Sequence, residues 1–219
     1  MTKTSVFFMP GLAASKTIFE KIKLPEDQFE IHLLEWILPN NKETLQGYAQ
    51  RMSAQIEVKN PVLIGVSFGG ILVQEMAQFV NAEKIIIISS VKCTAELPRR
   101  IKIAKTTKAY KLLPTSLLQD VEKLVKYSFG TTLKKKLQLY EKYLFMRNKQ
   151  YLDWAIEQVV CWERKEVGTN VVHIHGDIDE VFPTKYISNY IEVKGGTHAM
   201  IITKYKWFND NLPSIILKK

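Results

Sequence analysis

A single serine lies where a strand pattern changes into a helix pattern. The chain reads Gly65-Val66-Ser67-Phe68-Gly69-Gly70, which is a Gly-x-Ser-x-Gly sequence. The apolar run 61–64 before it is typical of a buried parallel strand, and the apolar spacing over 71–80 is typical of a helix. The flanking glycines permit a tight turn, which would lift the serine hydroxyl above the sheet edge as a nucleophile for acyl transfer. The alternative is a serine that only caps the helix.

A serine nucleophile needs a general base, and the chain contains four histidines. His198 lies in the glycine-rich segment 193–200, after the last expected strand, from which an imidazole could reach back over the sheet edge. This position fits the chain order of serine, acid and histidine, so His198 is the predicted base. His32 and His173 lie in strand patterns and are expected to be strand residues with satisfied hydrogen bonds. His175 is expected to support the loop that carries the acid.

Three carboxylates follow the β-branched run 171–174, within the segment 175–183. They are Asp177, Asp179 and Glu180. Side chains directly after a parallel strand lie at the carboxyl edge of the sheet, where ligands bind in open α/β folds. Asp177 and Asp179 are both candidates for the orienting acid, although Asp177 could instead cap the turn by accepting backbone N–H bonds. Glu180 is expected to be solvated.

The tetrahedral oxyanion of acyl transfer needs two backbone N–H donors. The first is predicted to be Phe68, the residue after the serine. The second is predicted to be Leu12, in the loop 10–15 that follows the expected strand 5–9. The small residues of this loop allow close backbone approach, whereas the Pro10-Gly11 pair could equally mark a plain turn.

Alternating strand and helix patterns must position these groups. The expected strands are 5–9, 29–34, 62–65, 85–89, 170–175 and 190–193, and helices are expected near 14–22, 42–57, 70–80 and 199–209. Ile85-Ile86-Ile87-Ile88 suits a central strand that is covered on both faces. Right-handed crossovers between such strands predict an α/β fold with a doubly wound, mostly parallel sheet.

Taken together, the segments 10–15, 65–70, 175–183 and 195–198 resemble the α/β-hydrolase superfamily, in its small, lid-bearing, esterase-like form. In the family pattern His-Gly-x-x-Asp-x-x-x-Pro the acid maps onto Asp179. The resemblance implies Ser67 as nucleophile, His198 as base, and Leu12 and Phe68 as oxyanion donors. The sequence departs from the family at Pro10, where a histidine is usual. It also begins near the family's third strand, so a reduced sheet is expected.

Residues 91–167 interrupt the alternation and are predicted to form a helical lid inserted into a core of residues 1–90 and 168–219. Three amphipathic helices are expected there. Their apolar faces are Leu117, Leu118, Val121, Leu124 and Val125 in the first, Leu133, Leu137, Tyr140, Leu144 and Phe145 in the second, and Tyr151, Trp154, Ala155, Val159 and Trp162 in the third. An insertion at this point would lie over the carboxyl edge of the sheet.

The net charge of +9 is concentrated in this insertion, where residues 91–165 hold 17 Lys and Arg against 7 Asp and Glu. Solvated helix faces explain such charge. It could also dock an acidic partner such as an acyl carrier protein or an anionic membrane surface, with Arg99 and Arg100 in the densest cluster. No nucleic-acid motif accompanies the charge, so nucleic acid is not an expected partner.

The function predicted from these observations is a serine hydrolase that cleaves a carboxylic ester or thioester, with no cofactor and no metal. Alternatives with the same fold are a carbon–carbon bond hydrolase, a lyase, an enzyme that uses peroxide, an acyl-carrier-linked ester hydrolase, or a ligand-binding receptor without catalysis. No apolar run is long enough for a transmembrane helix, and the N-terminus lacks a signal-peptide pattern. With only Cys93 and Cys161 present, a cytoplasmic location with reduced thiols is expected.

Overall fold

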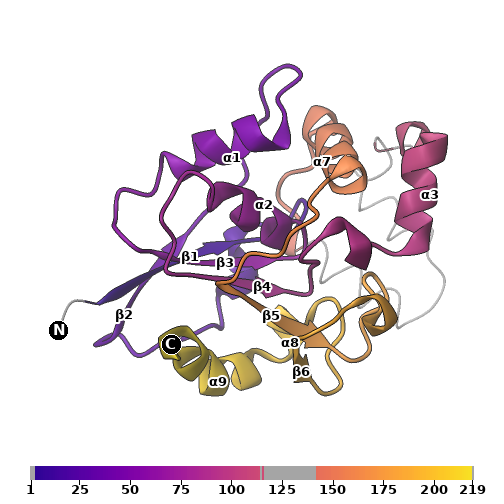
Figure 1. The fold of residues 1–219 in the computed structure, drawn as a ribbon. Coiled ribbons are helices and arrows are strands. Elements are labelled where there is room, and N and C mark those ends of the chain that lie inside the picture. Colours follow the sequence, from indigo (N-terminus) through magenta and orange to yellow (C-terminus); the bar gives the residue numbers. More distant parts are fainter. Residues whose placement is uncertain (1–2, 114, 116–141, 219) are drawn as a thin grey trace.

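The computed structural model describes residues 3–113, 115 and 142–218. Its centre is a six-stranded sheet in which every pair of neighbouring strands is parallel (Figure 1). The strand order is β2-β1-β3-β4-β5-β6. The strands are β1 (Thr4–Met9), β2 (Phe29–Leu33), β3 (Val62–Val66), β4 (Lys84–Ile88), β5 (Val171–Gly176) and β6 (Ile191–Val193).

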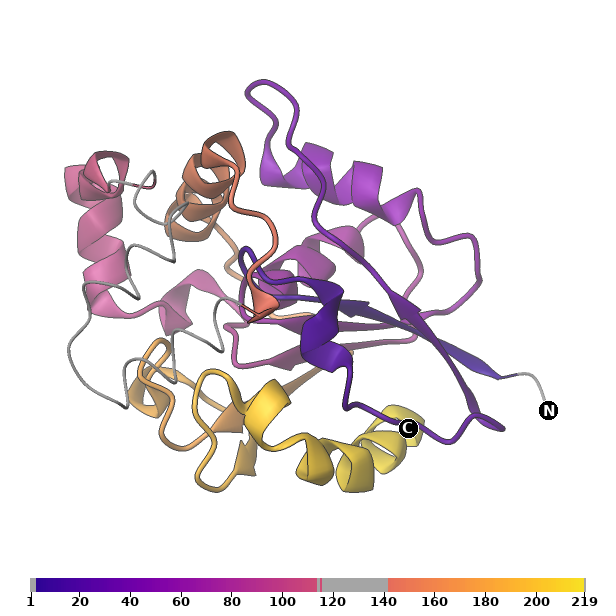
Figure 2. The ribbon, with the colours of Figure 1, turned by 180° about the vertical axis from the view of Figure 1, so that it is seen from behind.

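Helices cover both faces of this sheet. On one face lie α1 (Leu45–Ser53), α2 (Phe68–Met76) and α7 (Lys149–Cys161), and on the other lie α8 (Met200–Thr203) and α9 (Tyr205–Leu217) (Figures 1 and 2). Side chains of β4 alternate between the two cores, with Ile85 and Ile87 on the α2 face and Ile86 and Ile88 on the α9 face. The expected doubly wound sheet is therefore confirmed.

The chain order of the strands defines where a ligand can reach the sheet. After β1 the chain moves outward to β2, and it then returns to β3 on the other side of β1. The loops after β1 and β3 therefore diverge at a topological switch point, and this is where open α/β sheets bind ligands. Ser67 follows β3, and Leu12 lies in the loop after β1.

The expected helix 14–22 is wrong, because only a short 3₁₀-helix, η1 (Lys16–Phe19), forms there. The backbone just before it is used by a distant segment. The N–H of Ser15 donates to the carbonyl of Tyr143 (2.8 Å), and Ala14 forms an antiparallel bridge with Leu144. In this arrangement Ala13 has φ 61° and Ser15 is extended (φ −87°, ψ 165°), so a helix cannot begin at Ala14.

Of the insertion, the structure describes two 3₁₀-helices, η2 (Thr94–Glu96) and η3 (Ala109–Leu112), together with α3 (Arg99–Thr107) and α7. The third expected helix is present as α7. The first expected helix and residues 133–140 of the second lie outside the described residues. Leu144 and Phe145, assigned to the second helix from the sequence, instead lie in the segment that bridges to Ala14. None of the helices in the described ranges has the length and apolar composition needed to cross a membrane.

Candidate active site

Ser67 occupies a strained turn between β3 and α2. Its backbone has φ 53° and ψ −119°, and its side chain makes no capping hydrogen bond to α2. The helix-capping alternative is therefore wrong. The turn is tight enough that a Cβ on Gly65 would lie 2.2 Å from the carbonyl oxygen of Gly69. Strain of this kind costs on the order of 1–3 kcal/mol, and here it presents the hydroxyl away from the helix backbone.

The structure brings Ser67, His198 and Asp179 together in one hydrogen-bonded row. Ser67 Oγ lies 3.0 Å from His198 Nε2, and His198 Nδ1 lies 2.9 Å from Asp179 Oδ2. The His198 side chain is 28% exposed, whereas the Asp179 side chain is fully buried. The three residues are separated by as many as 131 positions in the chain, yet they meet at the carboxyl edge of β3, β5 and β6.

The surroundings of Asp179 keep its carboxylate ionised. Oδ1 accepts the backbone N–H groups of Val181 (2.8 Å) and Phe182 (2.9 Å). Burial alone would raise the pKa of Asp179, but its hydrogen bond to His198, the charge of His198 and the N–H of Phe182 lower the pKa overall. Because a carboxylate only accepts hydrogen bonds, His198 Nδ1 must carry a proton. Nε2 is then free to accept the proton of the Ser67 hydroxyl.

The other carboxylates of this loop have different surroundings. Asp177 Oδ1 accepts the N–H of Gly196 (3.1 Å). This bond connects the segment 175–183, called the acid loop below, to the segment 193–200 that carries His198. Glu180 is exposed. The two loops also touch directly, since a Cβ on Gly176 would lie 2.1 Å from the carbonyl oxygen of Gly196. This contact fixes the approach of His198 to the sheet edge.

Behind the acid loop lies a pair of buried histidines on β5. His175 Nε2 donates to the carbonyl of Phe182 (2.8 Å), and its Nδ1 faces His173 Nε2 (3.0 Å). Burial lowers the pKa of both histidines. His175 therefore supports the acid loop as expected. His32 stacks on Phe7 at 4.4 Å, and its Nε2 lies 3.6 Å from Glu30 Oε2, which is beyond hydrogen-bond distance. Contrary to expectation, His32 Nε2 and His173 Nδ1 form no hydrogen bond with a described residue.

The loop after β1, residues 10–15, is called the oxyanion loop below because it carries Leu12, which the sequence predicts as an oxyanion donor. A Cβ on Gly11 would lie 3.4 Å from the Cβ of Ser67, so the loop lies directly beside the serine. Within the described residues, the N–H groups of Leu12 and Phe68 have no protein acceptor. Both predicted donors are therefore unpaired in the part of the chain that the structure describes.

Two aromatic side chains that no sequence motif marks hold the oxyanion loop. Trp36, which follows β2, donates its indole N–H to the carbonyl of Gly11 (2.7 Å). Tyr151, in the first turn of α7, accepts the N–H of Ala13 (3.2 Å). The only sequence signal for Trp36 is its place just beyond the strand next to β1. Nothing local marks Tyr151, because its partner lies 138 positions away.

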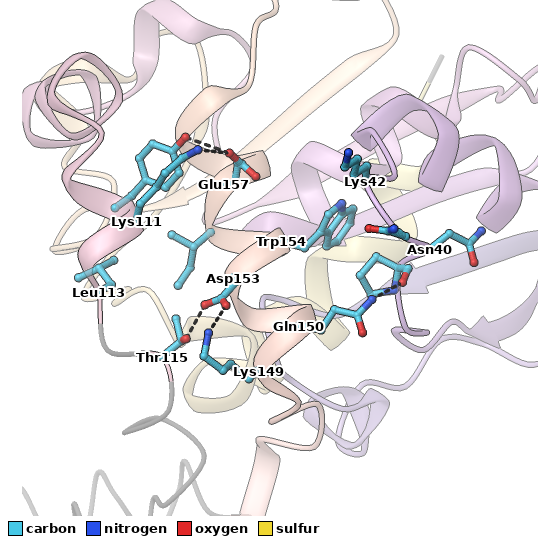
Figure 3. A pocket seen from close by; sticks show the side chains of 14 residues that line it. Asn40, Lys42, Lys111, Leu113, Thr115, Lys149, Gln150, Asp153, Trp154 and Glu157 are labelled. Atoms are coloured by element: carbon cyan, nitrogen blue, oxygen red, sulfur yellow. Dashed lines mark hydrogen bonds and ion pairs between the residues drawn. The ribbon is translucent and has the colours of Figure 1, made fainter.

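A separate pocket of about 410 Å³ lies between α7, η3 and the loop 39–42 (Figure 3). Four of its charged side chains pair with one another, Lys149 with Asp153 and Lys111 with Glu157 (Figure 3). Ser67, His198 and Asp179 do not line this pocket. In the described ranges, no group of three His, Cys, Asp or Glu side chains is placed to hold a metal ion.

Comparison with solved structures places this architecture in the α/β-hydrolase fold. The chain is similar to a thermophilic esterase from Thermogutta terrifontis, with a TM-score of 0.69 and 11% identity over 99% of this chain and 90% of the other. It is similar to a hydrolase from Pseudomonas aeruginosa PA01, with a TM-score of 0.69 and 15% identity over 98% and 90%. A bromoperoxidase from Bacillus anthracis gives a TM-score of 0.62 and 17% identity over 100% and 93%. No protein-family model and no curated protein sequence matches the chain.

Proposed function

We propose that this protein is a serine hydrolase that cleaves a carboxylic ester or thioester through an acyl-enzyme. The observation that carries the proposal is the continuous row from Ser67 Oγ through the two His198 nitrogens to Asp179 Oδ2, at 3.0 and 2.9 Å. A hydroxyl, a base and an orienting carboxylate in this order are the requirements of nucleophilic acyl transfer. Esterase, lipase and hydrolase are among the names of the similar structures, which agrees with this chemistry.

In the first half-reaction Ser67 Oγ attacks the substrate carbonyl carbon while its proton passes to His198 Nε2. Asp179 stabilises the resulting imidazolium through Nδ1. The carbonyl oxygen becomes an oxyanion that the N–H groups of Leu12 and Phe68 bind, each worth about 3 kcal/mol in comparable sites. When the tetrahedral intermediate collapses, the alcohol or thiol leaves with the proton from Nε2.

In the second half-reaction water attacks the acyl-serine and gives a proton to the same nitrogen of His198. Collapse of the second tetrahedral intermediate returns that proton to Ser67 Oγ and releases the carboxylic acid. Each half-reaction therefore uses His198 once as base and once as acid.

Hydrolysis of short p-nitrophenyl esters and thioesters tests the proposal. The folded wild-type protein is expected to release p-nitrophenol from the esters or p-nitrothiophenol from the thioesters, whereas Ser67→Ala and His198→Ala should lose at least about 10³-fold in kcat. Each variant should keep the wild-type thermal unfolding midpoint within a few degrees. A wild-type protein that hydrolyses no ester or thioester above background would contradict the proposal and favour a binding protein.

We further propose that the basic insertion docks an acidic carrier of the acyl substrate. Supporting this, α3 has no buried residues, and Arg99 and Lys185 line a small concavity next to the acid loop. Arg100 is already engaged, since its guanidinium donates to the carbonyls of Glu180 (2.9 Å) and Val181 (2.7 Å). Arg99→Glu should therefore raise KM for a carrier-linked ester but not for a free small ester. Equal effects on both substrates would remove the docking proposal.

A further inference from the structure

The oxyanion loop has one peptide unit whose orientation decides whether the second donor works. Gly11 C=O and Leu12 N–H belong to the same planar peptide, and in a trans peptide they point in opposite directions. The structure contains no cis peptide bond in its described residues. Whatever binds the oxygen of Gly11 therefore also aims the N–H of Leu12.

The indole of Trp36 binds that oxygen. Its Nε1–H donates to Gly11 O at 2.7 Å, and the side chain is almost fully buried, at 3% exposure. The same oxygen also accepts the N–H of Ala14 (3.0 Å). A peptide whose carbonyl accepts hydrogen bonds is polarised, which makes its own N–H a stronger donor. The contact therefore affects both the direction and the strength of the Leu12 N–H.

The ring of Trp36 also contacts the other donor residue. It stacks on Phe68 with centroids 4.9 Å apart and planes 7° from parallel. Phe68 is itself buried and begins α2 directly after the serine. One side chain thus stacks on the ring of Phe68, whose N–H is one predicted donor, and forms a hydrogen bond with the peptide that carries the other.

The peptide on the other side of Leu12 is held by the insertion. Ala13 has φ 61°, its N–H donates to Tyr151 Oη (3.2 Å), and its carbonyl accepts the N–H groups of Phe145 (2.8 Å) and Met146 (3.1 Å). Burial raises the pKa of Tyr151 well above its usual value, so its hydroxyl stays protonated and neutral. Both peptides that flank Leu12 are consequently fixed from outside the loop.

We propose that Trp36 is a positioning residue that orients the Leu12 N–H toward the transition-state oxyanion and sets its distance from the Phe68 N–H. The inference rests on the proposed serine hydrolase function, and it assigns to Trp36 a role in catalysis without contact with the substrate. Tyr151 assists by fixing the adjacent peptide of Ala13.

The test compares Trp36→Phe with Trp154→Phe. Trp154 is a matched control because it is also buried, also packs against Phe68 (5.9 Å), and also donates its indole N–H to a backbone carbonyl at 2.7 Å, but that carbonyl belongs to Glu43. Trp36→Phe is expected to lower kcat/KM for p-nitrophenyl esters roughly 10- to 100-fold, below the full loss of a donor, with KM within about threefold. Trp154→Phe should lower it less than about threefold.

A second readout reports on the oxyanion hole itself. Trifluoromethyl ketones form a tetrahedral adduct with the serine whose oxygen occupies the hole, whereas the matching methyl ketones bind chiefly as ground-state ligands. Trp36→Phe should weaken the trifluoromethyl ketone in parallel with kcat/KM and leave the methyl ketone unchanged. A role in packing alone would lower the thermal unfolding midpoint of both tryptophan variants without this selectivity.

Tyr151→Phe provides a second variant in case Trp36→Phe does not fold. It keeps the ring and removes only the acceptor of the Ala13 N–H, and Tyr48→Phe is its control, because Tyr48 is equally buried but bonds to Ile37. If the wild-type protein turns over esters and both Trp36→Phe and Tyr151→Phe behave like their controls, the positioning role is wrong while the hydrolase proposal stands. If the wild-type protein shows no turnover, the hydrolase proposal itself fails.

Discussion

Two aspartates two positions apart give the sharpest test of the candidate site. Asp179 Oδ1 accepts the N–H groups of Val181 and Phe182, and its Oδ2 faces His198 Nδ1. In Asp179→Asn the amide oxygen must keep the two backbone donors, so the NH₂ group turns toward His198. Nδ1 then has to accept a hydrogen bond and the proton moves to Nε2. An imidazole protonated at Nε2 cannot take the proton of Ser67.

The expected cost follows from this change of tautomer. In comparable triads the same substitution lowers kcat about 10⁴-fold, which corresponds to about 5.5 kcal/mol of transition-state stabilisation. Asp177→Asn is the matched control, because an asparagine oxygen can still accept the N–H of Gly196 (3.1 Å). Its kcat should therefore fall less than about threefold.

The assay is steady-state hydrolysis of p-nitrophenyl acetate by wild type and the two variants at pH 8. Thermal unfolding of each variant shows whether the fold is kept. The reasoning about the tautomer is refuted if Asp179→Asn retains more than a tenth of the wild-type kcat. It is also refuted if Asp177→Asn loses as much activity as Asp179→Asn, because the acid would then be assigned to the wrong residue.

Other parts of the molecule give three further predictions. The two buried histidines of β5 have pKa values below the usual 6.5, so the unfolded chain takes up protons first. Their contribution to stability is present above pH 6.5 and is lost as the pH falls, by up to about 1.4 kcal/mol per pH unit for each histidine. In urea unfolding at pH 7.5 and 5.5, the free energy of unfolding of His173→Gln should therefore fall less between the two pH values than that of the wild-type protein. Gly69→Ala should lower the free energy of unfolding by about 2–4 kcal/mol, since its Cβ would lie 2.3 Å from a carbonyl oxygen of the oxyanion loop. Gly47→Ala in α1 is the control, with no contact nearer than 3.4 Å, and equal unfolding midpoints would contradict the argument. Arg100→Gln should reduce kcat on free esters a few-fold by loosening the acid loop, whereas Arg99→Gln should not; identical kinetics of the two would show that the carbonyl contacts do not matter.

The sheet could be predicted from the sequence because each strand carries its own local signal. The run Ile85-Ile86-Ile87-Ile88 is apolar at every position, and such a run is stable only between two helical layers. The strand-to-helix change at Ser67 is equally local. Six expected strands are present, and their parallel order puts the ends of β1, β3 and β5 at one edge.

The parts that could not be predicted depend on contacts between distant residues. Ala13 pairs with Phe145 and Met146, and no local pattern shows that this pairing accompanies a non-helical backbone at residues 13 and 15. The residues alone also left Asp177 and Asp179 open, because both follow the same strand. Only the turn, in which Val181 and Phe182 fold back onto Asp179, separates their roles.

The central claim is that Ser67 is a nucleophile activated by His198. A fluorophosphonate probe tests this directly, because it reacts much faster with a serine whose hydroxyl is activated by a base than with an ordinary serine. Mass spectrometry of the labelled wild-type protein should place one adduct on the peptide that contains Ser67, with no adduct in Ser67→Ala and strongly slowed labelling in His198→Ala. A folded wild-type protein that remains unlabelled, or a label that persists in Ser67→Ala, would contradict the claim.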